Sequence, residues 1–333
     1  MRKTGEDILG LHFTEEQYAQ ASTSSSVGGL SLRKCTEHSP GAYAASWWES
    51  NKISGESWCA RSDTADLHGR NQKTASLEVD VAKINQLIAT SDARTARNLE
   101  SLQAPHANAW LSAVPSYVDG IDNRLPPLHF QTAVRRLLSI PTTKSDATCP
   151  FCTQTMNQFG DHALCCKKSG DNITRHNRIR NLVDRIADDG LLSPVMEKDG
   201  ILGHDDKTKR RPGDVSIPVW SKGKGVAIDV AVISTMVTAN RKHASPCDEY
   251  ATVVKHGKYD EAFKGSGYDF VALVLETSGA VNVEGEMILK QLFRFAAKRK
   301  GDRYSVYTAK AWARISITLQ HAVVQSILNR NSC

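Results

Sequence analysis

Apolar residues recur every three or four positions in several stretches upstream of residue 190, which is the spacing of an amphipathic helix. The pattern predicts helices over residues 77–103, 128–139 and 171–190. In the third of these, Asp171 or Asn172 can cap the first turn, and a glycine follows the last one.

Short apolar runs replace this pattern after residue 190. "LLSPVMEKDGIL" predicts a strand that bears Glu197, and "RRPGDVSIPVWSKGKGVAIDVAVIS" predicts a hairpin around a Ser-Lys-Gly-Lys-Gly turn. A helix ending near Gly265, the strand "YDFVALVLETSG", and helices over about 283–299 and 307–329 follow. The order from residue 171 is helix, three strands, helix, strand and two helices, which predicts a mixed α/β fold around a small sheet.

The N-terminal third of the chain is less regular. "ASTSSSVGGLS" (21–31) has the low complexity of a flexible segment. We therefore expect a poorly defined, partly flexible segment over 1–104 and a helical connector over 105–148. A small Cys/His segment over 149–170 and an α/β domain over 171–333 complete the expected organisation.

Composition narrows the functional classes. The 333 residues are 40% hydrophobic and 23% charged, with a net charge of +6, which fits a globular protein and permits a polyanionic partner. No apolar run approaches the roughly 18 residues that span a bilayer, and the first residues lack the apolar stretch of a secretory signal. We expect an intracellular protein, without membrane partners, whose 8 cysteines are reduced thiols or metal ligands.

Four of these residues have the spacing of a zinc site. Cys149 and Cys152 enclose two residues, nine residues separate Cys152 from His162, and three separate His162 from Cys166. Three thiolates and an imidazole favour zinc, and the set offers no open position, which predicts a structural site. Cys165 is a competing fourth ligand, and unrelated structural cysteines are the alternative to a metal site.

Each arm of the predicted hairpin carries one aspartate, and a bare carboxylate in a buried strand is costly. If Ser216 lies opposite Asp229, then Asp214 and Asp229 are diagonal neighbours on one face, with Cβ atoms about 7–8 Å apart. That gap suits one Mg²⁺ or Mn²⁺ ion, whose bound water can act as a nucleophile. The alternative is that Asp214 caps a turn and Asp229 pairs with a lysine for structural reasons.

The helix after the hairpin supplies candidate cations. Lys255 and Lys258 are three positions apart, which places them on one face of an α-helix, and Tyr259 is four positions from Lys255. A lysine beside a metal-bound carboxylate can orient or deprotonate water, or neutralise a phosphate. A solvated helix face is the structural alternative.

Together these motifs resemble the restriction-like endonuclease domain of non-LTR retrotransposon polyproteins, a member of the PD-(D/E)XK class. The similarity rests on "RPGD", a Trp-bearing strand, an apolar-Asp-Val strand, then Lys-x-x-Lys-Tyr on a helix. "CPFC…GDHALCC" followed by "TRHNRIRN", "AWLSAVPS" and "VLETSG" are also similar to segments of these polyproteins. The resemblance covers roughly residues 105–330 and implies a PD-(D/E)XK core with a preceding zinc knuckle.

The resemblance also implies roles for individual residues. Asp214 and Asp229 would bind the catalytic metal ion, Glu197 would complete its shell, and Lys258 would be the catalytic lysine, with Lys255 as the second choice beside Tyr259. Residues that would contact nucleic acid, or brace the site, are Arg175, His176, Arg210 and Arg211. The sequence departs from the family pattern at Gly213, which separates Pro212 from Asp214, and at Ala231, where many nucleases of this class place the lysine.

A nuclear, Mg²⁺- or Mn²⁺-dependent DNA endonuclease follows as the leading expectation. Its partners would be DNA, the element's RNA and the reverse transcriptase of the same element, to which it would supply a nicked strand. Two alternatives remain: a zinc-containing nucleic-acid-binding module that is catalytically inactive, and a decayed reading frame without stable function.

Overall fold

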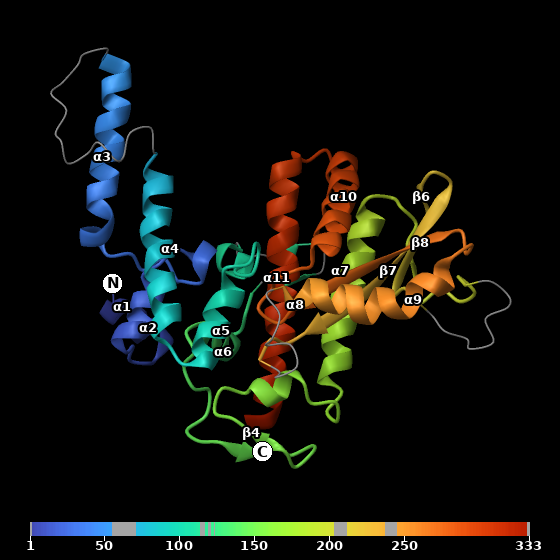
Figure 1. Ribbon diagram of the computed structural model, residues 1–333, viewed down its shortest axis with the longest axis horizontal. Helices are drawn as coiled ribbons and strands as arrows, with labels where there is room; N and C mark the ends of the chain where they lie inside the picture. The colour runs from blue at the N-terminus through green and yellow to red at the C-terminus, as the bar shows by residue number, and fades with distance from the viewer. Residues whose placement is uncertain are drawn as a thin grey trace. The chain divides into compact units, whose positions relative to one another are not determined.

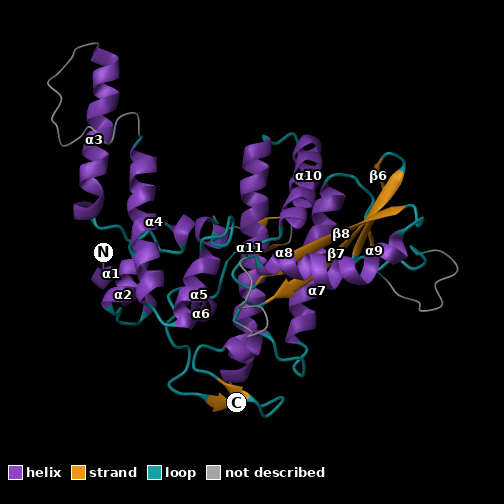
Figure 2. Cartoon of the chain, viewed as in Figure 1, coloured by secondary structure: helices purple, strands orange, loops and turns teal. Residues whose placement is uncertain are grey.

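The computed structural model describes residues 2–54, 71–113, 117–118, 121–122, 124–202, 212–236 and 245–331. The chain divides into two compact units, which are described separately: Met1–Gln103 with Leu137–Ile140, and Ala104–Arg136 with Pro141–Cys333. Figure 1 follows the chain through both, and Figure 2 marks their helices and strands. Among the described residues, no helix has both the length and the hydropathy needed to cross a membrane.

The first unit is helical. Its elements are α1 (Arg2–Leu9), α2 (Glu15–Ala21), the 3-10 turn η1 (Ser25–Val27), α3 (Cys35–Ser54), α4 (Gln72–Thr90) and α5 (Ala93–Leu102). Val27, Ile84, Leu87 and Leu99 form a buried cluster between them. The single helix expected over 77–103 is wrong, because the Asp92 side chain accepts hydrogen bonds from the N–H groups of Arg94 and Thr95 and caps a separate helix, α5.

The second unit begins with small elements that lead to its sheet. These are η3 (Ala109–Ser112), β1 (Tyr117–Val118), β2 (Ile121–Asp122), α6 (Pro127–Leu137), β3 (Ala147–Thr148), β4 (Thr155–Met156) and the 3-10 turn η4 (Asp161–Leu164). The β3 and β4 strands pair antiparallel and carry the first two cysteines of the expected metal site in and beside their connecting turn.

The sheet has four strands in the order β5 (Val195–Met196), β6 (Val215–Ser221), β7 (Lys224–Ile233) and β8 (Tyr268–Glu276). The first two pairs are antiparallel, and β7 and β8 are parallel. Helix α7 (Asp171–Asp189) precedes the sheet, and α10 (Val283–Lys300) and α11 (Tyr304–Asn331) follow it. The expected mixed α/β architecture and the order of its elements from residue 171 are therefore confirmed.

Helices cover both faces of this sheet, and the alternation along β7 explains how. Val226, Ile228 and Val230 point to one face and pack with side chains of α7, α10 and α11 in the main core. Ala231 and Ile233 lie on the other face, against a smaller cluster that includes Cys247 and Ala251. Asp229 points to the same face as Ala231 and Ile233, so its carboxylate lies beside an apolar layer.

The β6–β7 hairpin contains a bulge that changes its register. Lys222 and Gly223 form the turn with φ angles of 51° and 77°, as a two-residue type I′ turn requires. Ser221 pairs with Lys224, and Ile217 pairs with Val226, so three residues of β6 face a single residue of β7 between these pairs. Pro218 lies in this bulge, where its missing N–H costs no ladder hydrogen bond.

The bulge corrects the register expected from the sequence. Continuing the Ser221–Lys224 register without a bulge would place Ser216 opposite Asp229, as expected, whereas Ser216 pairs with Ala227. Because the shift is two residues, it leaves every side chain on its original face. Asp214 and Asp229 therefore still share a face.

The helical segment after β7 is not a continuous α-helix. It consists of α8 (Pro246–Glu249), a π-helical segment η6 (Tyr250–His256) and α9 (Gly257–Phe263). The π-helical segment adds residues to each turn, so it changes which side chains face the sheet. Its last residue, His256, has both ring nitrogens near carboxylates: Nδ1 lies 2.7 Å from Asp260 Oδ1, and Nε2 lies 2.8 Å from Glu284 Oε2.

We predict that replacing His256 with Gln reduces stability more at acidic than at alkaline pH. Burial lowers the pKa of His256, but the hydrogen bonds to Glu284 and Asp260 outweigh it, so the net pKa is raised. The stabilisation is complete below the unfolded histidine pKa of about 6.5 and disappears as the pH rises through the folded value. Denaturant unfolding of both proteins across this range measures it, and a pH-independent difference would contradict the ion pairs.

Candidate metal centre and acidic site

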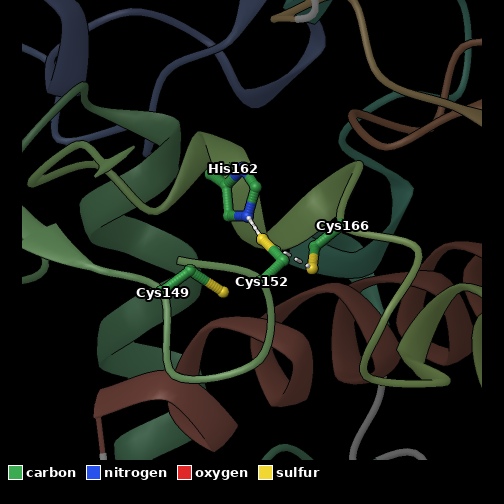
Figure 3. Close-up of side chains that lie close together, drawn as sticks. All are labelled: Cys149, Cys152, His162 and Cys166. Carbon is green, nitrogen blue, oxygen red and sulfur yellow. Dashed lines mark hydrogen bonds between the residues drawn. The ribbon is translucent and has the colours of Figure 1, made fainter. Parts of the chain in front are cut away.

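Cys149, Cys152, His162 and Cys166 converge on one point in the second unit (Figure 3). One potential ligand atom from each of the four lies within 4.8 Å of every other. The Cys152 Sγ atom is 3.1 Å from His162 Nε2 and 3.6 Å from Cys166 Sγ. The residues therefore fit the expected site, a cluster that can hold a metal ion such as zinc.

The fourth member of this cluster is Cys166 and not Cys165. The neighbouring thiol of Cys165 points to the carbonyl oxygen of His162, at 3.4 Å, and burial raises its pKa. Burial alone would raise the pKa of the Cys149 thiol. The hydrogen bonds from the backbone N–H groups of Phe151 and Cys152 have a larger, opposite effect, so the pKa falls to about 6. Cys149 is thus disposed to be a thiolate, the form that binds metal.

Two aspartates face one another across the β6–β7 pair. Val215 pairs with Ile228, and continuing this register by one residue sets Asp214 across from Asp229. Residues directly opposite in an antiparallel pair have Cβ atoms about 4.5–5.5 Å apart, closer than the diagonal arrangement expected from the sequence. The Asp214 Oδ2 atom accepts a hydrogen bond of 2.6 Å from the Val230 N–H, which fixes this carboxylate against β7.

Each aspartate has a different basic partner. Asp229, which is only 6% exposed, forms an ion pair with the Lys255 ammonium from η6. Asp214 Oδ2 lies 3.1 Å from Nε2 of His176, a residue of α7. Lys255 and His176 therefore approach the pair from separate helices, one after and one before the hairpin.

The electrostatics of these four groups are coupled. Burial raises the pKa of Asp229, although the nearby Lys255 opposes this, and Asp214 adds to the rise. Burial lowers the pKa of Lys255, but Asp229 raises it more, so the ammonium keeps its charge. The hydrogen bond to Asp214 raises the pKa of His176, which favours its imidazolium form.

Lys258 and Tyr259 lie elsewhere on the segment. The Lys258 Nζ atom is exposed and sits 4.6 Å from the centre of the Tyr259 ring, and that ring packs on Phe270. Lys255 belongs to η6 and Lys258 to α9, so the shared α-helical face assumed from their spacing is interrupted. Of the two lysines, it is Lys255 that forms an ion pair with a site aspartate.

Glu197 does not complete a shell around the two aspartates. Among the described residues, Asp214, Asp229 and Glu197 do not gather into a group of three metal-binding side chains. The Glu197 backbone N–H does donate to the Asp214 carbonyl, at 3.0 Å, but its carboxylate pairs with Arg180 on α7. The sequence predicted that the Glu197 carboxylate binds a metal ion. In the structure its partner is Arg180, which the sequence did not reveal.

The residues expected to contact nucleic acid have different surroundings. Arg175 is 2% exposed and donates to the Leu164 carbonyl and the Asn172 side chain, so nucleic acid cannot reach its guanidinium. Burial lowers its pKa to about 10. His176 braces Asp214, which was the alternative to a phosphate contact. Arg210 and Arg211 lie outside the described residues.

Comparisons with known proteins add no family assignment. A scan against models of protein families finds no match to this chain, and a search of curated proteins finds none either. The two sites are therefore interpreted from their own geometry.

The structure also explains why a glycine separates Pro212 from Asp214. Gly213 has a φ of +96°, and a Cβ built on it would lie 2.8 Å from the Cβ of Ala227 on β7. The chain must therefore pass close to β7 with left-handed backbone geometry just before the aspartate, which requires glycine.

We predict that Gly213→Ala destabilises the protein and displaces Asp214. The strained backbone alone costs about 1–3 kcal/mol, and the clash with Ala227 adds to it. Gly223→Ala is the matched control, because Gly223 is also left-handed (φ +77°) but has nothing within 4 Å of a built Cβ. Denaturant unfolding compares the two, and equal losses of stability would show that the close approach to β7 is unimportant.

We predict that Cys166→Ser lowers zinc content and thermal stability, whereas Cys165→Ser retains both. Loss of one of four ligands weakens a closed site, whose binding free energy contributes to folding. The measurements are metal content per purified chain and thermal unfolding with and without a chelator. Full zinc loading of the Cys166 variant would exclude this ligand set.

Proposed function

We propose that the protein is a metal-dependent DNA endonuclease whose active site is built on Asp214 and Asp229. The observation that carries the proposal is the convergence of these two carboxylates with Lys255 and His176 at one end of the β6–β7 pair. Paired carboxylates with an adjacent amine on a mixed sheet are the arrangement that the resemblance to PD-(D/E)XK nucleases implies.

The acidic pair fits a divalent cation on the evidence of its own donors. Lys255 pairs with the buried Oδ2 atom of Asp229, and Asp214 lies opposite Asp229 on the neighbouring strand. Because the two carboxylates repel each other, the pair gains from a further cation, and hard oxygen donors select Mg²⁺ or Mn²⁺. Such an ion, when bound, would lower the pKa of a water ligand and stabilise charge on a phosphate.

The chain's own residues then have distinct tasks. Asp214 and Asp229 would hold the cation, and the Val230 N–H and His176 keep the Asp214 carboxylate in position. Because the pKa of Lys255 is raised through Asp229, Lys255 acts as a fixed positive charge toward a scissile phosphate and not as a general base. Water bonds to the phosphorus and loses a proton to solvent, the bond from phosphorus to the leaving oxygen breaks, and that oxygen takes up a proton from solvent.

The biological setting of this activity follows from the same resemblance. We propose a retrotransposon origin and a role in the nucleus, where a nicked DNA strand would prime reverse transcription by the polymerase of the element. The element's RNA is a further candidate partner. The net charge of +6 is compatible with binding to a polyanion.

We predict that the protein nicks supercoiled plasmid in Mg²⁺ or Mn²⁺, and that Asp229→Asn loses about 10²–10⁴-fold in rate. Asn keeps the size of the side chain and removes the anion. Lys255→Gln should lose activity by a similar factor, whereas Lys258→Gln should nick at a nearly normal rate. Comparing these two variants shows which lysine the reaction needs. Agarose electrophoresis measures the rates, and circular dichroism checks folding.

Two outcomes would overturn this proposal. Nicking that survives Asp229→Asn would place the active site elsewhere or indicate a contaminating nuclease. DNA binding without nicking in either metal would support the inactive nucleic-acid-binding module instead.

A further inference from the structure

Arg330, near the end of α11, lies next to the metal-binding cysteines although it is 164 residues or more from them in sequence. Its side chain is completely buried. The guanidinium is close enough to the thiols of Cys149 and Cys166 to interact with them electrostatically. It also lies over the ring of Phe151, between the first two cysteines, at 5.2 Å from the ring centre.

The same guanidinium contacts the start of α7. Its Nη1 atom lies 2.6 Å from Asp171 Oδ2, and its Nη2 atom donates to the Ser169 hydroxyl over 2.7 Å. One arginine thus joins the turn between the first two cysteines, the segment that follows the last one, and the first helix of the α/β domain. A lysine, with one ammonium on a flexible stem, cannot make this set of contacts.

Charge explains why a cation belongs here. Three thiolates and a neutral imidazole around a divalent ion carry one net negative charge, and Asp171 adds another beside them. Burying net charge without compensation costs several kcal/mol per ion. The buried Arg330 lies beside both negative charges, and its positive charge stabilises the deprotonated ligands and the Asp171 carboxylate.

We propose that Arg330 is a positioning residue for the metal centre, which it stabilises by packing on Phe151 and bonding Ser169 and connects to α7 through Asp171. Metal binding at the knuckle therefore orders the first turn of α7. His176, the partner of Asp214, follows Asp171 by five residues on this helix. The inference concerns zinc affinity and helix order, so its failure is distinguishable from failure of the nuclease proposal.

The test compares Arg330→Met and Arg330→Lys with the wild-type chain. We expect Arg330→Met to weaken zinc binding about 10–100-fold, with Arg330→Lys between the two because it keeps the charge. In the cobalt-substituted protein, loss of the neighbouring positive charge should move the thiolate-to-cobalt band to lower energy. A merely structural role for Arg330 would leave this band unchanged.

Arg175→Met is the matched control. Arg175 is equally buried and lies on α7, but it donates to the Leu164 carbonyl and the Asn172 side chain and not to Ser169 or Asp171. This variant should lose stability without moving the cobalt band. Amide hydrogen exchange over the first turn of α7 should be fast in Arg330→Met and in chelator-treated wild type, and slow in zinc-loaded wild type.

Three results would overturn the inference. The first is an unchanged zinc affinity and cobalt band in Arg330→Met. The second is the same band shift in Arg175→Met as in Arg330→Met. The third is exchange in the first turn of α7 that does not respond to zinc removal. If Arg330→Met fails to fold, the exchange experiment on the wild-type chain still decides the question.

Discussion

Burial of the Asp229 carboxylate is the constraint around which this end of the second unit is arranged. The residue sits in the middle of β7 and is 6% exposed. The next two residues on the same face of the strand are Ala231 and Ile233, which are buried. An isolated charge at such a position would be strongly unfavourable. The fold offsets this cost with Lys255 from η6 and with the more distant His176, which itself holds the neighbouring Asp214. A buried carboxylate that needs compensating charges from two helices adds little to the stability of the fold. Its presence therefore favours a functional reason for the arrangement.

The parts of this design that depend on local periodicity could be predicted from the sequence. The helical pattern of α7, the two apolar arms of the hairpin and the buried strand β8 each have a strong signal, so the element order was recoverable. The zinc ligands were recoverable as well, because their spacing is short and local. The hairpin register was not, since the turn alone sets a register that the bulge at Pro218 then shifts by two residues. The face shared by Asp214 and Asp229 was predicted correctly only because that shift is even.

The contacts that were missed are those made between distant segments. Lys255 was ranked below Lys258 because the resemblance assigns the catalytic role to the lysine before Tyr259. The α-helical period that placed both lysines on one face is broken by the π-helical segment Tyr250–His256, just before Lys258. Arg180 and Arg330 were not identified because nothing near them in sequence indicates a carboxylate or a thiolate partner. Arg175 is of a residue type that commonly binds phosphate, yet it is buried and donates to the carbonyl oxygen of Leu164. Charge alone does not distinguish an arginine that faces solvent from one that ties two elements together.

Helix α7 connects these observations, because both sites depend on it. Its first residue, Asp171, pairs with Arg330 beside the cysteines, its second turn carries His176 against Asp214, and Arg180 one turn later holds Glu197. The apolar side of the same helix, with Ile179, Leu182, Val183 and Ile186, packs in the main core. A rigid helix with one anchor at the knuckle and another in the core transmits position along its length, because a packed core resists small displacements. The Cys/His cluster and the acidic site therefore share α7 as a common support, although no direct contact joins the four cluster residues to the aspartates among the described residues.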